Sequence, residues 1–221
     1  MASAPRPRIH DAEAFQSEFA VSRETLDRLV TYEALLKQWQ KTINLVAPST
    51  LSDIWHRHFA DSAQLWRYRP VGAESWLDVG SGAGFPGLVL AILAQQHGPS
   101  RHVLVESDTR KAAFLREVAR KTGVAVDILC TRIESTETLA RVQRVSCVTA
   151  RALAPMPRLA SLVAPYFASD SVGLFLKGRE VAVELEEAAR SWDFSCDLKP
   201  SLTDADGRVV LLTVLKAKSE G

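Results

Sequence analysis

From Gly72 onward, short β-rich runs alternate with segments of helical periodicity. Parallel strands need a crossover connection, usually a helix, so this alternation predicts a mostly parallel α/β sheet with helices on both faces. Seven strands are expected, at residues 75–79, 102–106, 125–130, 145–150, 172–177, 194–198 and 208–215. Helices are expected between the first six, at about 84–96, 110–122, 134–142, 157–167 and 180–190. The last two strands are joined only by an Asp206-Gly207 turn signal, so one edge strand should run antiparallel.

The N-terminal part of the chain has a different pattern. Apolar residues recur at helical spacing over residues 24–40, after Ser22 as a candidate N-cap, and again over about 50–67. We therefore expect two parts: an N-terminal helical segment, residues 1–71, and an α/β domain, residues 72–221.

Composition excludes several classes of protein. Apolar residues make up 47% and charged residues 24% of the chain, which is typical of a globular protein and argues against disorder. The longest strongly apolar run, residues 88–94, is far shorter than the roughly 20 residues of a membrane-spanning helix. The charged N-terminus lacks the apolar core of a signal peptide, so we expect a cytoplasmic protein without a membrane partner.

The cysteines and histidines give no sign of a disulfide framework or a metal site. Cys130, Cys147 and Cys196 are widely spaced, and no CxxC is present. Cys130 and Cys147 lie in apolar runs and are expected to be buried. His56 and His58, two residues apart, point to different sides of a helix. We therefore expect no bound metal.

A glycine-rich turn follows the first strand directly. Residues 76–88 read WLDVGSGAGFPGL, so Gly80, Gly82 and Gly84 alternate between a strand and a helix. Glycines at such a turn let a ligand approach the backbone without meeting a Cβ atom. In a doubly wound sheet this turn lies at the carboxyl edge of the strands, where ligands bind.

Two ligand classes compete for this turn. The string Gly82-x-Gly84-x-x-Gly87 matches the dinucleotide fingerprint, so a nicotinamide-binding oxidoreductase is one interpretation. Asp78 favours S-adenosylmethionine, because a carboxylate there attracts the positive amino-acid end of that cofactor and repels a pyrophosphate. Glu106 ends the second strand, where an acidic residue can accept two ribose hydroxyls.

Several longer motifs then point to one family. They are WQKTINL at residues 39–45, RHFADS at 57–62, LDVGSGAGFPG at 77–87, FLREV at 114–118, TARALA at 149–154 and FLKG at 175–178. With these motifs the chain resembles the bacterial small-subunit rRNA guanine-N7 methyltransferase family, called RsmG or GidB, over residues 24–216. The resemblance implies a Rossmann-like class I methyltransferase fold, S-adenosylmethionine as cofactor, and 16S rRNA of the small ribosomal subunit as substrate.

The resemblance also implies site residues. The cofactor should contact the turn at Gly80, Gly82, Gly84 and Phe85, with its ribose on Glu106 and its adenine beside Ile133 and Glu134. Arg151, directly after the fourth strand, matches a family arginine near the methyl-transfer pocket. Arg151 can bind cofactor, a phosphate or the target base, or form a structural salt bridge with Asp78 or Glu134.

The chemistry of guanine N7 matches what the sequence lacks. N7 has an in-plane lone pair and no proton, so its methylation requires placement rather than a general base. No Asn/Asp-Pro-Pro-aromatic tetrapeptide, typical of exocyclic-amine methyltransferases, follows the fourth strand. A covalent cytosine-C5 mechanism needs an exposed thiolate, whereas Cys147 alternates with apolar neighbours and is expected in the core.

RNA is expected to bind at the same sheet edge. The candidate residues are Arg57, His58, Lys111, Arg158, Lys177 and Arg179, together with Arg151. His58 and Asp61 are one helical turn apart and so are spaced to bond each other. We expect a monomer without an obligate protein partner. The helical segment either binds RNA or covers the sheet. A small-molecule methyltransferase and a non-enzymatic RNA-binding module remain alternatives.

Overall fold

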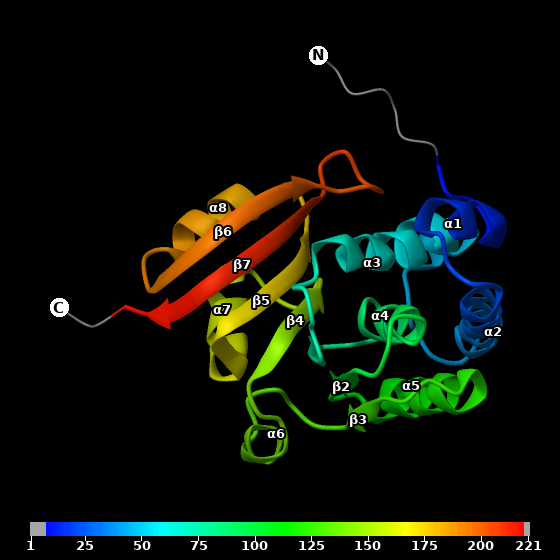
Figure 1. The fold of residues 1–221 in the computed structure, drawn as a ribbon, viewed down its shortest axis with the longest axis horizontal. Coiled ribbons are helices and arrows are strands. Elements are labelled where there is room, and N and C mark those ends of the chain that lie inside the picture. The colour runs from blue at the N-terminus through cyan, green and yellow to red at the C-terminus, as the bar shows by residue number, and fades with distance from the viewer. Residues whose placement is uncertain (1–7, 219–221) are drawn as a thin grey trace.

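A single sheet organises the chain, which the computed structural model describes over residues 8–218. Its strands are β1 (Ser75–Val79), β2 (Arg101–Val105), β3 (Asp127–Leu129), β4 (Val145–Arg151), β5 (Phe167–Lys177), β6 (Trp192–Pro200) and β7 (Arg208–Ala217). They lie in the order β3-β2-β1-β4-β5-β7-β6 (Figure 1). The seven expected strands are confirmed, and β5 begins five residues earlier than its apolar run suggested.

The antiparallel strand is not at the edge of the sheet, contrary to the sequence-based expectation. Strands β1 to β5 pair in parallel, whereas β7 runs antiparallel to both β5 and β6. Burial explains the order: Val209, Val210 and Leu212 of β7 are fully buried, while most of β6 is exposed. The more apolar strand takes the inner position, and β6 forms the edge.

Helices cover both faces of the sheet, as predicted. Helices α4 (Gly87–Ala94) and α5 (Thr109–Thr122) lie on one face, and α6 (Thr136–Arg141), α7 (Met156–Val163) and α8 (Val181–Ala188) on the other (Figure 1). Helix α4 starts three residues later than expected because Gly84, at φ +93°, cannot be helical. All eight residues of α4 are buried, since a further layer of helices covers its outer side.

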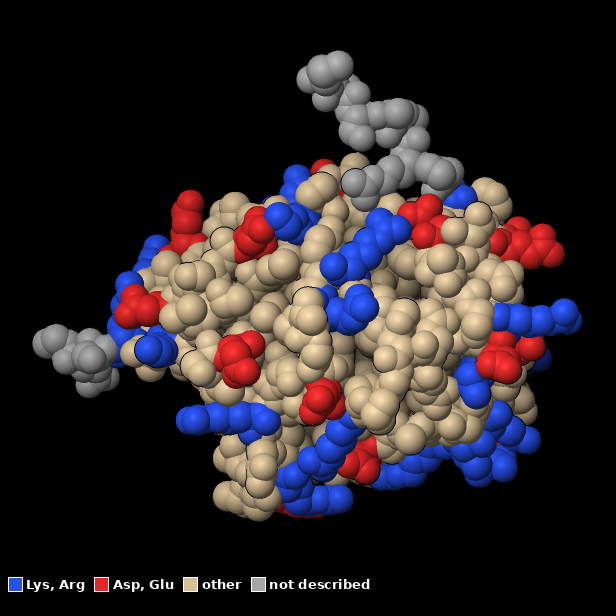
Figure 2. Space-filling view, viewed as in Figure 1, with Lys and Arg blue, Asp and Glu red and all other residues tan. Residues whose placement is uncertain are grey.

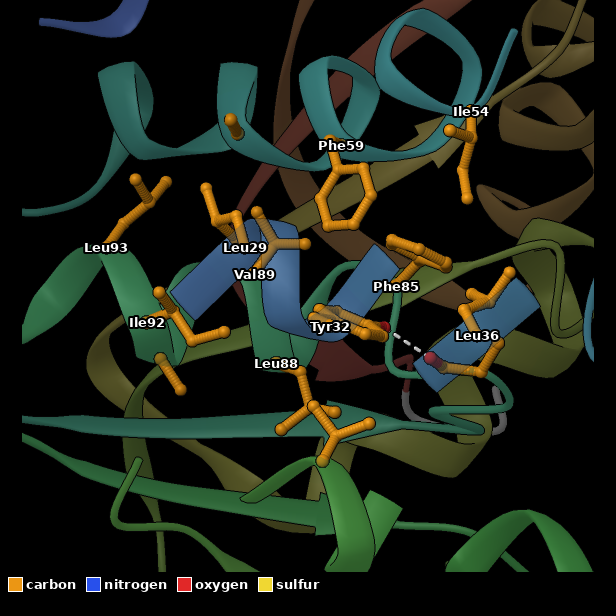
Figure 3. Packing of buried hydrophobic residues seen from close by; sticks show 14 of the residues in the cluster. Leu29, Tyr32, Leu36, Ile54, Phe59, Phe85, Leu88, Val89, Ile92 and Leu93 are labelled. Atoms are coloured by element: carbon orange, nitrogen blue, oxygen red, sulfur yellow. Dashed lines mark hydrogen bonds between the residues drawn. The ribbon is translucent and has the colours of Figure 1, made fainter. Parts of the chain in front are cut away.

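The N-terminal helices form that outer layer. They are α1 (Ala12–Phe19), α2 (Arg23–Trp39), η1 (Pro48–Asp53), η2 (Trp55–Ala60), α3 (Asp61–Ala63) and η3 (Gln64–Tyr68). Leu29, Tyr32 and Leu36 of α2 share one apolar cluster with Leu88 and Ile92 of α4 (Figure 3). The helical segment and the sheet domain are therefore packed against each other through a common core.

Two local details of this layer depart from or match the sequence pattern. Ser22 caps α2 as expected, accepting a hydrogen bond of 3.1 Å from the Thr25 amide. The helix expected over residues 50–67 is divided into 3-10, π and α turns, and α1 was not predicted because its apolar pattern is short. No helix within residues 8–218 is both long and apolar enough to cross a membrane.

Candidate active site

The glycine-rich turn connects β1 to α4 at the carboxyl edge of the sheet. Gly80, Gly82 and Gly84 all have positive φ, at +66°, +55° and +93°. A Cβ atom on Gly82 would meet nothing closer than 3.8 Å, so the backbone at that residue is open to a ligand. A Cβ atom on Gly84 would lie 2.5 Å from the hydroxyl of Tyr32, so that side of the turn is closed.

Glu106 lies immediately after β2 and joins two loops. Its Oε2 accepts a hydrogen bond of 2.7 Å from the Gly82 amide, and its Oε1 accepts one of 2.7 Å from the Asp108 amide. The Glu106 side chain is largely buried. Each carboxylate oxygen keeps a lone pair after these bonds, so the group can still accept hydrogen bonds from a diol.

Asp78 lies beneath the turn rather than on its open surface. It is only 3% exposed, and its Oδ1 accepts a hydrogen bond of 2.6 Å from Thr149. Its Oδ2 is buried against the start of α4, beside the backbone of Gly87, where a Cβ on that residue would lie 2.6 Å away. Burial raises the pKa of Asp78 to about 6. The site therefore holds a buried carboxylate that a positive ligand would stabilise.

Two cavities lie near the turn, and Gly80 is the turn residue that lines the smaller of them. The smaller, of about 280 Å³, is lined by Gly80 and Ile133 with Glu134 and Arg158, which form an ion pair at 3.5 Å. The larger, of about 700 Å³, contains most of the polar candidates. Leu153 lines both cavities, and a Cβ on Gly80 would lie 2.5 Å from its Cδ1. The two cavities thus meet at Leu153, directly over the glycine-rich turn.

Arg151 projects into the larger cavity from the end of β4. Its Nη1 lies 3.4 Å from Oδ2 of Asp61 and donates to the carbonyl of Arg57 at 3.2 Å. Its guanidinium lies 5.0 Å from the centre of the Phe85 ring. A structural salt bridge with Asp78 or Glu134 was one alternative for Arg151; the structure shows an ion pair, but its partner is Asp61 of the helical segment.

His58 and Asp61 do not bond each other, so that prediction was also wrong. His58 pairs through Nε2 with the Thr50 hydroxyl at 2.7 Å, whereas Asp61 accepts from Gln64 at 2.9 Å and Thr203 at 2.7 Å. Burial, followed by the charges of Arg151 and Arg57, lowers the pKa of His58 to about 3. His58 is therefore neutral at physiological pH and does not supply a cation to this cavity.

The ring of Phe85 belongs to the core rather than to the open face of the turn. It stacks on Tyr32 at 5.2 Å and on His58 at 5.0 Å, and it is buried (Figure 3). Only the backbone of Phe85 is placed to line the turn. The ring instead connects α2 to the cavity that contains Arg151.

The RNA candidates fall into three groups. Arg57, His58, Arg151 and Lys177 all line the larger cavity, Arg158 lines the smaller one, and Lys111 and Arg179 line neither. Arg57 forms an exposed ion pair with Asp204 at 3.4 Å. On the face shown in Figure 2, basic and acidic residues are interspersed rather than gathered in one basic patch.

Lys177 is the least accessible of these cations. Its side chain is 9% exposed, and its Nζ bonds Glu184 at 2.6 Å and the carbonyl of Ala154 at 2.7 Å. The loop between β6 and β7 contributes Thr203 to the same cavity, and β7 contributes its first residue, Arg208, which the sequence did not indicate beyond the turn signal at residues 206–207. Their place depends on β7 lying inside the sheet.

Comparisons with known proteins agree with this geometry. A family model described as rRNA small subunit methyltransferase G matches residues 25–207. Two relatives share the name "Ribosomal RNA small subunit methyltransferase G". The Rhodospirillum centenum protein is 51% identical over 95% of this chain and 93% of its own length. The Parvibaculum lavamentivorans protein is 48% identical over 92% of this chain and 89% of its own.

A solved structure supports the fold. A TehB-like SAM-dependent methyltransferase from Corynebacterium glutamicum superimposes with a TM-score of 0.55 over 84% of this chain and 98% of its own, at 13% sequence identity. The sheet order and the helices on both faces are therefore those of a Rossmann-like class I methyltransferase.

Proposed function

Because the chain belongs to the rRNA small subunit methyltransferase G family, we propose that it transfers a methyl group from S-adenosylmethionine to N7 of a guanine in 16S rRNA. The observation that carries the proposal is the place of the open glycine-rich turn, with Glu106 beside it and the cavity around Arg151 adjoining it.

The residues of the turn fit the cofactor. Gly82 leaves room beside its backbone, and Glu106 has free lone pairs for a ribose. Asp78 lies buried beneath the turn, where its negative charge would attract a cation bound above it without contacting that cation. Ile133 and Glu134 line the smaller cavity, where an adenine would lie. When bound, S-adenosylmethionine supplies a methyl group on a positively charged sulfur.

The larger cavity is suited to placing a base rather than to removing a proton. Guanine N7 attacks through its lone pair and loses no proton, so a general base is not required. Two titratable groups of the cavity agree: the pKa of His58, lowered to about 3, makes it a weak proton acceptor and its Nε2 is already bonded to Thr50, and Asp61 already accepts three hydrogen bonds. Arg151 is then the residue whose role is to orient the base or an adjacent phosphate.

The basic residues differ in how they could meet RNA. Arg57, at the exposed rim of the cavity, and Arg158, beside the smaller cavity, are placed to meet RNA phosphates. Lys111 and Arg179 line neither cavity and would meet RNA only outside them. Within the expected division at residues 71 and 72, the helices from residue 12 to residue 68 support the α/β domain, and the enzyme works as a cytoplasmic monomer.

The deciding experiment is transfer of labelled methyl from S-adenosylmethionine to small ribosomal subunits from a strain that lacks this modification. Naked 16S rRNA and large subunits are tested in parallel. Label in small-subunit RNA, released as 7-methylguanine, supports reaction, atom and substrate together. Label at another atom of the base refutes the N7 assignment. Absence of label, with cofactor binding intact, favours a small-molecule acceptor.

A further inference from the structure

Two buried tyrosines each donate a hydrogen bond to a backbone carbonyl in a loop of the proposed cofactor site. The Tyr32 hydroxyl donates to the carbonyl of Ala83 in the glycine-rich turn (dashed line in Figure 3). The Tyr166 hydroxyl donates to the carbonyl of Ile133, in the segment after β3, at 2.6 Å. Both bonds join elements far apart in sequence, and neither tyrosine lines either cavity.

Tyr32 is held rigidly behind the turn. Its side chain is fully buried, and its ring stacks on Phe85 at 5.2 Å and meets Phe59 edge-on at 5.2 Å. Burial raises the pKa of Tyr32 well above its ordinary value, so the hydroxyl stays protonated and acts as a donor. The turn has other hydrogen bonds, which lie toward β1 and β2: the Ser81 amide donates to the carbonyl of Val105 at 3.1 Å, the Ser81 hydroxyl to that of Asp78 at 3.2 Å, and the Gly82 amide to Glu106. The Gly84 amide donates within the turn to the carbonyl of Ser81 at 2.7 Å, so Tyr32 supplies the bond from the side of α2.

The fit between Tyr32 and the turn is close. A Cβ atom on Gly84 would lie 2.5 Å from the Tyr32 hydroxyl oxygen, so only glycine leaves room for it there. The positive φ of Gly84 is likewise a conformation that L side chains rarely adopt. The hydroxyl and the glycine thus fix one conformation of the turn together.

Tyr166 occupies the corresponding position on the other face of the sheet. It lies in η4 (Ala164–Tyr166), is 1% exposed, and packs in the cluster that α7 and α8 form with the sheet. Burial raises the pKa of Tyr166 to about 12, so this hydroxyl is also a donor. In the segment it holds, the carbonyl of Arg132 accepts from the Thr138 hydroxyl at 2.8 Å and from the Ser135 amide at 3.1 Å.

We propose that Tyr32 and Tyr166 are positioning residues, which hold the two loops of the cofactor site in the binding conformation from opposite faces of the sheet. The inference rests on the proposed function, since it concerns the same cofactor. A loop that samples other conformations binds its ligand with an apparent Kd equal to the intrinsic Kd divided by the fraction of time that the loop spends in the binding conformation. Each hydroxyl suppresses those conformations without contacting the ligand.

The test compares Tyr32→Phe and Tyr166→Phe with Tyr68→Phe as the matched control. Tyr68 is half-buried, and its hydroxyl makes no hydrogen bond within residues 8–218. For each full-length variant, calorimetry gives the Kd for S-adenosylhomocysteine, thermal unfolding gives the midpoint, and methyl transfer to small subunits gives kcat and KM. Losing one buried hydrogen bond is expected to raise Kd and the KM for cofactor about tenfold. We expect kcat at saturating cofactor to stay within about twofold, and Tyr68→Phe to leave all values unchanged.

Three results would overturn the inference. A lowered unfolding midpoint with an unchanged Kd would mean that the tyrosines serve only stability. A loss of kcat with an unchanged KM would place them in the chemical step. Tyr68→Phe with the same rise in Kd would show that the effect is not specific to these loops. If one variant does not fold, the other decides, because the two bonds lie in separate loops. Wild-type protein that binds no S-adenosylhomocysteine would refute the proposed function itself.

Discussion

The carboxylate of Glu106 accepts a hydrogen bond of 2.7 Å from the amide of Gly82, and so ties the end of β2 to the glycine-rich turn. The sequence predicted Glu106 as a ribose acceptor but did not indicate this second contact. A residue that both orders the turn and meets the ligand affects binding in two ways.

Glu106→Ala is therefore expected to weaken cofactor binding, by a few kcal/mol at most, because a charged hydrogen bond is lost and the turn is loosened. Calorimetry with S-adenosylhomocysteine measures the change. Glu186→Ala, at an exposed residue of α8, is the control. An unchanged Kd in Glu106→Ala would remove Glu106 from the site.

Asp78 gives the enzyme a pH-dependent stability. Its pKa in the folded protein is about 6, above the ordinary 3.8, so the folded state binds the proton more tightly than the unfolded state does. The free energy of unfolding is thus lowered as pH rises from about 4 to 6, and the full cost, about 3 kcal/mol, remains at pH 7. Asp78→Asn should remove this cost and weaken cofactor binding.

Denaturant unfolding of wild type and Asp78→Asn between pH 4 and pH 7 tests the prediction. The difference in stability should be small near pH 4 and grow toward neutrality. Taking the difference is necessary because burial raises the pKa of Asp61 as well, and lowers that of His58 and His102. A difference independent of pH would show that Asp78 does not titrate in this range.

Much of the fold was predictable because its signals are local. The alternation after Gly72 predicts the strands, Ser22 predicts the start of α2, and the three glycines predict the turn. The partner of Arg151 was not predictable, because Asp61 is 90 residues away and reaches it only through packing of the helical segment. The contact between Tyr32 and the glycine-rich turn was not predictable for the same reason. In the sequence, Tyr32 has the pattern of an ordinary core residue of α2.

The pairing of Arg151 with Asp61 can be separated from its role in the reaction. Arg151→Ala leaves the Asp61 carboxylate without its cation, which should cost about 1–3 kcal/mol of stability and lower kcat/KM at least tenfold. The double variant Arg151→Ala/Asp61→Asn should regain stability but not activity. Chemical unfolding and methyl transfer are measured on both, with exposed Arg190→Ala as control. Activity restored in the double variant would mean that Arg151 is only structural.

Arg57 and Lys177 should respond differently to salt, although both line the larger cavity. Arg57 is exposed at the rim, whereas Lys177 is bonded to Glu184 and to a carbonyl. Arg57→Ala should reduce the slope of log K against log salt for RNA binding by about 1. Lys177→Ala should lower the unfolding midpoint and leave the slope unchanged. Equal slopes for both variants would contradict the assignment of Arg57 to a phosphate.

Cys147 provides a test of the chemistry itself. Its side chain is fully buried on β4, and burial raises the pKa of the thiol well above its ordinary value, so a thiolate is absent at neutral pH. The sequence predicted this core position.

Cys147→Ser should keep its methyl-transfer activity within about twofold while losing about 1–3 kcal/mol of stability, since the new hydroxyl is buried among apolar neighbours. Cys196→Ser, on the exposed edge strand β6, should change neither value. Complete loss of activity in folded Cys147→Ser protein would indicate a covalent step at this sulfur, which direct attack by N7 does not require.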